Sequence, residues 1–250
     1  MNEILDRCPV CGRATKMKLT RDYLDEPCIV DCICDCEDQK NADEQKHYRQ
    51  ESDRLHRSGY FHSILNDAKF RGYTFARDDG RNEKVSKYCR NYVMNFPQKL
   101  SKAKLKGVML AGDTGIGKSF FAACIGHALE SDGYSVLATT LPKLSGEIGL
   151  DQYNIRLQQL RQYQLLIIDD WGVERKTEYM DEFMQTVIDE RYRQELPVII
   201  TTNRSIQDIA YPKDPGDHRI ISRLCDMVEV VPVKGQDRRI EGYQQRLRGT

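Results

Sequence analysis

The stretch GDTGIGKS, residues 112–119, constrains the fold of this chain more than any other. It lies between an apolar run, GVMLA, and an apolar helical segment, FFAACIGHALE, and it has the form G-x-x-x-x-G-K-[ST]. Gly112, Gly115 and Gly117 allow backbone N–H groups to curl around phosphate oxygens without Cβ clashes, and the start of the following helix adds positive potential. The pattern therefore predicts a phosphate-binding loop between a buried strand and a helix.

Two side chains of this loop have predicted roles. Lys118 is expected to reach the β- and γ-phosphates of a nucleotide, and Ser119 is expected to hold Mg²⁺ through its hydroxyl group. The predicted nucleotide-binding residues are Gly112, Asp113, Thr114, Gly115, Ile116, Gly117, Lys118, Ser119 and Phe120. The predicted ligands are ATP or ADP together with Mg²⁺.

Five short apolar runs indicate the strands of a sheet, and longer helical stretches such as 120–130 and 179–194 separate most of them. The runs are 108–110, 136–138, 165–168, 198–201 and 227–231. Alternation of buried strands with helices is typical of a parallel sheet that is covered on both faces. We therefore predict an α/β fold with a five-stranded parallel sheet and helices on both faces.

Polar residues follow two of these runs. Asp169 and Asp170 end the run LLIIDD, at the edge where ligands bind in such sheets. Asp169 is expected to contact Mg²⁺, mostly through water, and Asp170 to polarise the water that attacks the γ-phosphate. Asn203 ends VIITTN and could bond that water or the γ-phosphate, although Thr-Thr-Asn alone is more typical of a turn.

The motifs GDTGIGKS, LLIIDDWGVE, PVIITTNRS and RIISRL resemble those of the AAA+ ATPases, and more closely those of the family of DnaC and DnaI helicase loaders and IstB. The resemblance covers about residues 60–240. It implies that Arg223, with Arg219 as the alternative, is an arginine finger acting on ATP in a neighbouring subunit. It also implies that Arg239 of GQDRR, with Arg238 as the alternative, is the second sensor.

One feature departs from the AAA+ pattern. Many AAA+ ATPases have Asp-Glu where this chain has Asp169-Asp170, and the shorter Asp170 places the attacking water less well. IstB-like and DnaI-like sequences often share Asp-Asp, so we expect a slow ATPase that a partner or DNA stimulates. The resemblance places Asn203 at the first sensor position.

Six of the nine cysteines lie in the first 36 residues. Cys8-x-x-Cys11 followed by Gly12 is typical of a zinc-binding turn. Tetrahedral Zn²⁺ takes four ligands, so at most two more come from the remaining four. These are Cys28, Cys32, Cys34 and Cys36. The last three cysteines of the chain have apolar neighbours and are expected in the core; they are Cys89, Cys124 and Cys225.

Relatives of the loader family often have a cysteine pair just before a charged helix, which favours Cys34 and Cys36 as the second pair of zinc ligands. Cys32 with Cys34 is the alternative. A reducing compartment disfavours a disulfide, and an iron–sulfur cluster is a further possibility for clustered thiols.

Three segments follow from these patterns. About 36 residues are too few for an independent core, so bound metal is expected to supply the folding energy of residues 1–36. Residues 37–59 are highly charged and are predicted to form a linker helix. Residues 60–250 are predicted to form the ATPase domain.

Composition restricts the environment of the chain but not its partners. No apolar run approaches the roughly 20 residues of a membrane span, and the first residues are charged and interrupted by Pro9. We therefore expect a cytoplasmic protein without membrane association. Lys+Arg and Asp+Glu are equal at 38 each, so net charge excludes no class of partner.

The resemblance implies an ATP-dependent helicase loader. Its AAA+ domains would self-associate and hold single-stranded DNA through basic loops, for which Lys143, Arg175 and Lys176 are candidates. The zinc-binding domain would bind the hexameric replicative helicase. The alternative is an IstB-like ATPase that assists a transposase on DNA. A small-molecule kinase is a third possibility, but that function does not account for the motifs TTN and RIISRL.

Overall fold

The computed structural model describes residues 3–19, 28–31, 36, 46, 61–100, 106–146, 157–173, 177–212 and 214–248. The chain divides into two compact units, Met1–Gln50 and Glu51–Thr250. The predicted linker helix, residues 37–59, lies outside the described residues except for Lys46.

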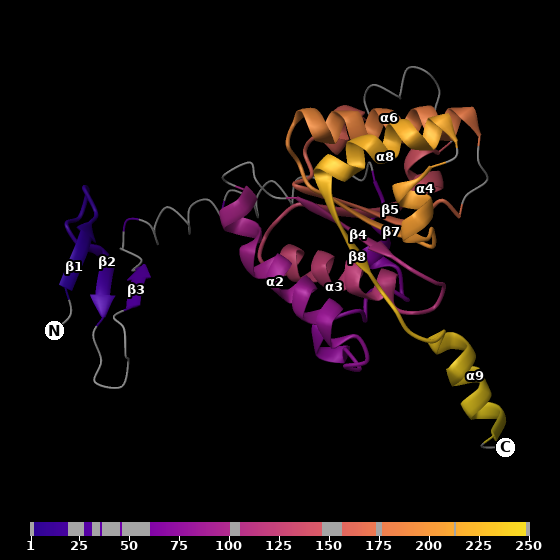
Figure 1. Ribbon diagram of the computed structural model, residues 1–250, viewed down its shortest axis with the longest axis horizontal. Coiled ribbons are helices and arrows are strands. Elements are labelled where there is room, and N and C mark those ends of the chain that lie inside the picture. The colour runs from indigo at the N-terminus through magenta and orange to yellow at the C-terminus, as the bar shows by residue number, and fades with distance from the viewer. Residues whose placement is uncertain are drawn as a thin grey trace. The chain divides into compact units, whose positions relative to one another are not determined.

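The first unit contains a three-stranded antiparallel sheet (Figure 1). Its strands, in spatial order, are β1 (Glu3–Arg7), β2 (Ala14–Leu19) and β3 (Cys28–Asp31). The turn between β1 and β2 is tight: the Gly12 amide donates to the Cys8 carbonyl at 2.8 Å, and Gly12 has a φ of 72°. Glycine adopts this left-handed conformation at no steric cost, so the turn places Cys8 and Cys11 on one short loop.

The second unit is built on a five-stranded sheet in which all neighbouring strands are parallel, as the sequence predicts. Its strands are β4 (Gly107–Ala111), β5 (Val136–Thr140), β6 (Leu165–Trp171), β7 (Val198–Thr202) and β8 (Val228–Pro232). The spatial order is β5-β6-β7-β4-β8, which places β4 between β7 and β8. The loop that follows β4 therefore lies beside the ends of both neighbours.

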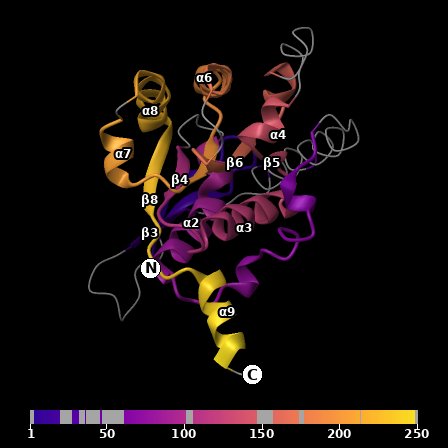
Figure 2. The same cartoon turned by 90° about the vertical axis from the view of Figure 1, so that its right-hand side faces the viewer.

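Helices cover both faces of this sheet, as predicted (Figures 1 and 2). One face carries α2 (Glu83–Leu100) and α3 (Lys118–Ser131). The other carries α4 (Leu141–Ser145), α6 (Glu178–Arg193) and α8 (Pro215–Met227), and α7 (Ile206–Ala210) precedes α8. The last helix, α9 (Arg238–Arg248), projects away from the sheet (Figure 2).

The central strands have apolar side chains on both faces because both faces are covered. Leu166 and Ile168 belong to the core on the α6 side. Ile167 points to the other side, where a Cβ on Gly126 of α3 would lie 3.0 Å from the Ile167 Cδ1 atom. This alternation explains why β6 reads as a continuous apolar run in the sequence.

Arg191 of α6 is buried and ties together the starts of two strands. Its guanidinium donates to four backbone carbonyls at 2.5–3.2 Å, those of Leu160, Tyr163, Gln164 and Pro197. Burial lowers the pKa of Arg191 to about 9, so it remains charged at neutral pH. These bonds fix the chain before β6 and before β7, at the ends opposite to the predicted nucleotide site.

No helix among the described residues is long and apolar enough to cross a membrane.

Candidate nucleotide-binding site

The loop between β4 and α3 has the backbone conformation that its glycines permit. Gly112, Gly115 and Gly117 have φ values of 148°, 78° and 105°. Gly117 is the residue immediately before α3. A Cβ on Gly115 would lie 2.1 Å from the Asp237 Oδ1 atom, so this position has no room for a side chain. The loop thus forms an open backbone curve at the start of a 14-residue helix, which suits an anion.

Lys118 is 4% exposed, and it is one of the residues that line the site. The Nζ atom donates to the Asp113 carbonyl and to the Asn203 Oδ1 atom, both at 2.6 Å. Burial lowers the pKa of Lys118, and the nearby carboxylates of Asp170 and Asp169 oppose this effect. Two predicted site residues that are far apart in sequence, Lys118 and Asn203, are therefore in direct contact.

Asp169 and Ser119 form a set of oxygen ligands suited to Mg²⁺. Asp169 is 5% exposed and its Oδ1 atom accepts a hydrogen bond from Thr201 Oγ1 at 2.7 Å. Burial raises the pKa of Asp169, while hydrogen bonds from Thr201 and Ser119 lower it. A buried carboxylate beside a hydroxyl group fits a hard cation, because Mg²⁺ prefers oxygen ligands.

Asp170 has an unusual backbone, with a φ of 57°. The register between β6 and β7 shifts between Ile168 and Trp171, and the Asp170 amide donates to Thr201 Oγ1 at 2.8 Å. A non-glycine residue in this conformation costs about 1 kcal/mol or more, so it persists only where the surroundings impose it. The irregularity lets Asp170 line the site, whereas Asp169 next to it is buried.

The site opens as a cleft of about 450 Å³, within the usual size range of small-molecule sites. The lining residues are Lys69, Tyr73, Thr114, Gly115, Gly117, Lys118, Ser119, Phe120, Asp170, Val173, Asn203, Arg238 and Arg239. Most were predicted from motifs. Lys69, Tyr73 and Val173 were not: Lys69 and Tyr73 lie outside every motif, and Val173 lies within LLIIDDWGVE but had no predicted role.

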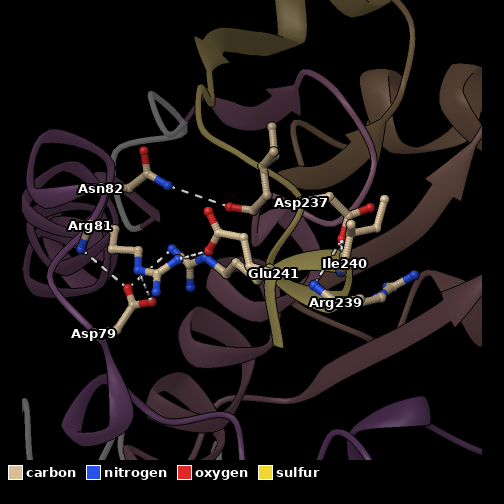
Figure 3. A network of polar contacts seen from close by, with 9 residues as sticks. Asp79, Arg81, Asn82, Asp237, Arg239, Ile240 and Glu241 are labelled. Carbon is tan, nitrogen blue, oxygen red and sulfur yellow. Dashed lines mark hydrogen bonds and ion pairs between the residues drawn. The ribbon is translucent and has the colours of Figure 1, made fainter. Parts of the chain in front are cut away.

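The start of α9 is bonded to the phosphate-binding loop. The Arg238 amide donates to the Gly115 carbonyl at 3.1 Å, and its guanidinium pairs with Asp79 at 3.2 Å. Arg81 pairs with Glu241 in the same network (Figure 3). Both predicted sensor candidates, Arg239 and its alternative Arg238, consequently reach the cleft.

The geometry of the loop, the acidic pair and Asn203 agrees with the comparison to known proteins. A family model described as an IstB-like ATP binding protein matches residues 97–246. The chain belongs to this family. Membership in this family identifies the chain as an ATP-binding protein.

The relatives of this IstB-like chain include helicase loaders and ATP-binding proteins of insertion sequences. The replicative helicase loader DnaI of Bacillus subtilis is 24% identical over 219 residues, which are 82% of this chain and 68% of DnaI. An ATP-binding protein of insertion sequence IS1162 from Pseudomonas fluorescens is 36% identical over 88 residues. That match covers 34% of this chain and only 38% of the relative's length.

Solved structures confirm the predicted AAA+ fold. The crystal structure of the DnaC helicase loader superimposes with a TM-score of 0.56 and 21% identity, covering 67% of this chain and 99% of that chain. Identity at this level supports the fold alone.

Arg223, the predicted arginine finger, does not reach the cleft. Its Nε atom lies 2.8 Å from Asp189 Oδ1, and its guanidinium lies 5.1 Å from the centre of the Tyr192 ring. Arg223 is near the end of α8, just before β8 begins, whereas the phosphate-binding loop follows the other end of the parallel strand β4. A role in hydrolysis therefore requires the nucleotide of another subunit. The alternative, Arg219, is exposed and also lies outside the cleft lining.

In the IstB-like chain the first unit brings three predicted metal ligands together. The sulfur atoms of Cys8, Cys11 and Cys36 lie within 4.8 Å of one another. Thiolates around one tetrahedral Zn²⁺ are about 3.8 Å apart, since Zn–S is about 2.3 Å, so these three fit the ion. Cys34, the fourth predicted ligand, lies outside the described residues, and so does Cys32, which would replace Cys36 in the alternative pair.

The predictions of core cysteines and of basic DNA-contacting residues have different outcomes. Cys89 and Cys124 are buried, and burial raises the pKa of each to about 12. The prediction for Cys225 is wrong: it is exposed, because the buried face of α8 is formed by Ile220, Ile221 and Leu224 instead. Lys143 is exposed and pairs with Asp67 at 3.2 Å. Arg175 and Lys176 lie outside the described residues.

Proposed function

We propose that this protein is an ATP-dependent helicase loader that binds a replicative DNA helicase and single-stranded DNA when DNA replication is initiated. The observation that carries this proposal is the extent of the similarity to DnaI, which covers 82% of the chain. The family model covers only residues 97–246, and the IS1162 relative matches 34% of the chain. The similarity to a loader therefore extends well beyond the segment that all these proteins share.

The cleft is proposed to hold ATP or ADP through the chain's own donors. Backbone N–H groups of the phosphate-binding loop and Lys118 would bind the phosphates, and Ser119 and Asp169 would hold Mg²⁺. Bound Mg²⁺ supplies charge neutralisation at the phosphates. Asp170 would orient and polarise the attacking water, with Asn203 beside it.

A second cleft of about 290 Å³ is lined in part by Ile116 of the loop and shares Arg238 with the first. It is the candidate for the nucleoside. Its other lining residues are Arg81, Asn82, Ile116, Lys234, Gly235, Gln236 and Glu241.

Hydrolysis is proposed to be slow in the isolated chain and faster in an assembly. Asp170 is a short carboxylate in a strained conformation, and Arg223 lies away from the cleft of its own chain. A neighbouring subunit would supply Arg223 through self-association of the AAA+ domain. Arg223→Ala is expected to abolish stimulation by DNA or helicase while leaving ATP affinity unchanged, as measured by phosphate release and by equilibrium binding. Rapid hydrolysis by the monomer that Arg223→Ala does not reduce would contradict this.

The first unit is proposed to be a zinc site that binds the helicase. Cys8, Cys11 and Cys36 would hold Zn²⁺ together with Cys34, and the metal would stabilise a region too small for its own core. The purified protein should be colourless and contain one Zn per chain. A brown protein that absorbs visible light would instead indicate an iron–sulfur cluster.

The decisive experiment is co-purification with a hexameric replicative helicase. Wild-type protein should retain the helicase, and Cys11→Ser should lose both zinc and helicase. Cys225→Ser is the matched control, because Cys225 is an exposed cysteine outside the first unit and should change neither property. Retention of the helicase by metal-free Cys11→Ser would contradict the role given to the first unit.

The similarity to insertion-sequence ATP-binding proteins supports a second candidate function. In this alternative, the chain assists a transposase and acts on duplex DNA. Two such proteins are 36% and 35% identical to this chain over 88 and 94 residues. Co-purification of a transposase instead of a helicase, with ATP hydrolysis stimulated by duplex rather than single-stranded DNA, would favour it.

A further inference from the structure

Arg204 lies directly after Asn203, just beyond the end of β7, and it is not part of the cleft lining. Its side chain is 21% exposed. An arginine this well covered, next to a residue that contacts Lys118, needs a physical explanation.

The guanidinium of Arg204 makes two kinds of contact. It forms a two-pronged pair with Asp217 in the first turn of α8: Nη1 lies 2.9 Å from Oδ2, and Nη2 donates to Oδ1 at 3.1 Å. It also lies over the ring of Trp171, with 4.4 Å from its central carbon to the ring centre. Trp171 is 2% exposed and the Asp217 side chain 13%, so both contacts are largely shielded from water. Charge-assisted forks and stacked guanidinium groups are strongest under such conditions.

Gly172 provides the space for this arrangement. A Cβ on Gly172 would lie 2.6 Å from the Arg204 Nε atom, and Gly172 also has a φ of 88°. Any other residue here would displace the guanidinium or strain the backbone. The packing is therefore specific to an arginine above a glycine.

The same region is bonded to the site along the backbone. Thr202 Oγ1 donates to the Trp171 carbonyl at 2.7 Å and accepts from the Arg204 amide at 3.2 Å. Trp171 directly follows Asp170, and Arg204 directly follows Asn203. Both polar residues at the end of the cleft are thus next in sequence to one cluster, formed by Trp171, Thr202 and Arg204.

We propose that Arg204 is a positioning residue for ATP hydrolysis. By clamping Trp171 and Asp217, it holds Asp170 and Asn203 in place beside Lys118 and joins them to α8, the helix that carries Arg223. This inference rests on the hydrolysis proposed for the cleft. Arg204 is not among the residues that line the cleft, so its loss should affect turnover and not nucleotide affinity.

The test uses Arg204→Gln and Arg204→Lys in the full chain. We expect kcat for ATP to fall about tenfold or more in both, with the Kd for ATP within about twofold of wild type. Lysine should not restore turnover, because an ammonium group cannot make the two-pronged pair and stack at the same time. Arg161→Gln is the matched control: Arg161 pairs with Glu190 at 2.9 Å, away from the cleft lining, and this variant should keep the wild-type kcat.

Trp171 provides a readout that general destabilisation would not mimic, since it is the only tryptophan in the chain. Emission from the folded, nucleotide-free protein should shift in Arg204→Gln but not in Arg161→Gln. Addition of ATP should change the emission of wild-type protein, and this change should be smaller in Arg204→Gln.

A kcat of Arg204→Gln within twofold of wild type, or an equal loss in Arg161→Gln, would overturn the proposal. If Arg204→Gln does not fold, Asp217→Asn and Gly172→Ala disrupt the same clamp from its other sides. Both should then lower kcat while ATP binding persists, and normal turnover in both would also overturn it. Absence of ATP hydrolysis by wild-type protein would instead refute the proposed function, and the emission of Trp171 would still report whether Arg204 responds to ATP.

Discussion

Replacement of Thr201 by valine tests how the acidic end of β6 is held. Thr201 is buried, and its hydroxyl group donates to Asp169 at 2.7 Å while accepting from the Asp170 amide at 2.8 Å. Valine nearly matches the shape of threonine but can neither donate nor accept. The substitution therefore removes one hydroxyl group that serves both acidic residues.

The expected loss of stability can be worked out from these two bonds. A hydrogen bond to a charged group is worth about 1.5–3 kcal/mol, and an amide left without its acceptor costs about 1–3 kcal/mol. Because both bonds share one hydroxyl group, their energies do not add in full, and we expect the free energy of unfolding to fall by about 2–4 kcal/mol. Each kcal/mol should lower Tm by about 2–4 °C in a chain of this size.

Urea and thermal unfolding in Mg²⁺-free buffer, followed by circular dichroism, measure this loss. Thr201→Ser is the matched control, because serine keeps the hydroxyl group and loses only a methyl group, for about 1 kcal/mol. Thr201→Val should also shift Mg²⁺ binding to higher pH, since the bond from Thr201 lowers the pKa of Asp169. A decrease of less than about 0.5 kcal/mol, or equal losses in the valine and serine variants, would refute the reasoning.

Three further substitutions have definite expected outcomes. Burial raises the pKa of Asp169, so the stability linked to its protonation is full below the ordinary aspartate pKa and is lost as pH rises through the raised value. Asp169→Asn should therefore increase the free energy of unfolding at neutral pH, and it should abolish Mg²⁺-dependent hydrolysis. A lower free energy of unfolding in urea at pH 7 would contradict this. Arg191→Met removes the donor from four carbonyls and should destabilise the chain by at least about 2 kcal/mol in the same assay. Gly115→Ala should weaken ATP binding more than tenfold in equilibrium titrations, because its Cβ would clash with Asp237; wild-type affinity would show that the loop relaxes.

The sequence predicts those parts of the site that local patterns specify. The five strands, the glycine loop and the placement of Lys118 and Asn203 at one site follow from apolar runs and from the rule that parallel strands end at one edge. All these features depend on the order of elements and not on the details of side-chain packing.

Other parts of the site depend on packing between distant segments and leave no local signal. Lys69 and Tyr73 line the cleft because of the path of the chain before α2, which has no motif. In the sequence, Arg204 is typical of a turn residue, and only the structure shows its contacts with Trp171 and Asp217. Cys225 was predicted to be buried because of its apolar neighbours, but helical periodicity turns it to the exposed side of α8.

Because the first turn of α9 is bonded to the phosphate-binding loop, a rotation of that turn would move the other end of the helix over a larger distance. None of its residues is buried, and its first turn is bonded directly to the Gly115 peptide of the phosphate-binding loop. A helix of 11 residues is about 16 Å long, so a tilt of about 20° at the anchored end would move the other end by about 6 Å. A small rotation of one peptide beside the phosphates would thus become a displacement large enough for a spectroscopic label on α9 to detect.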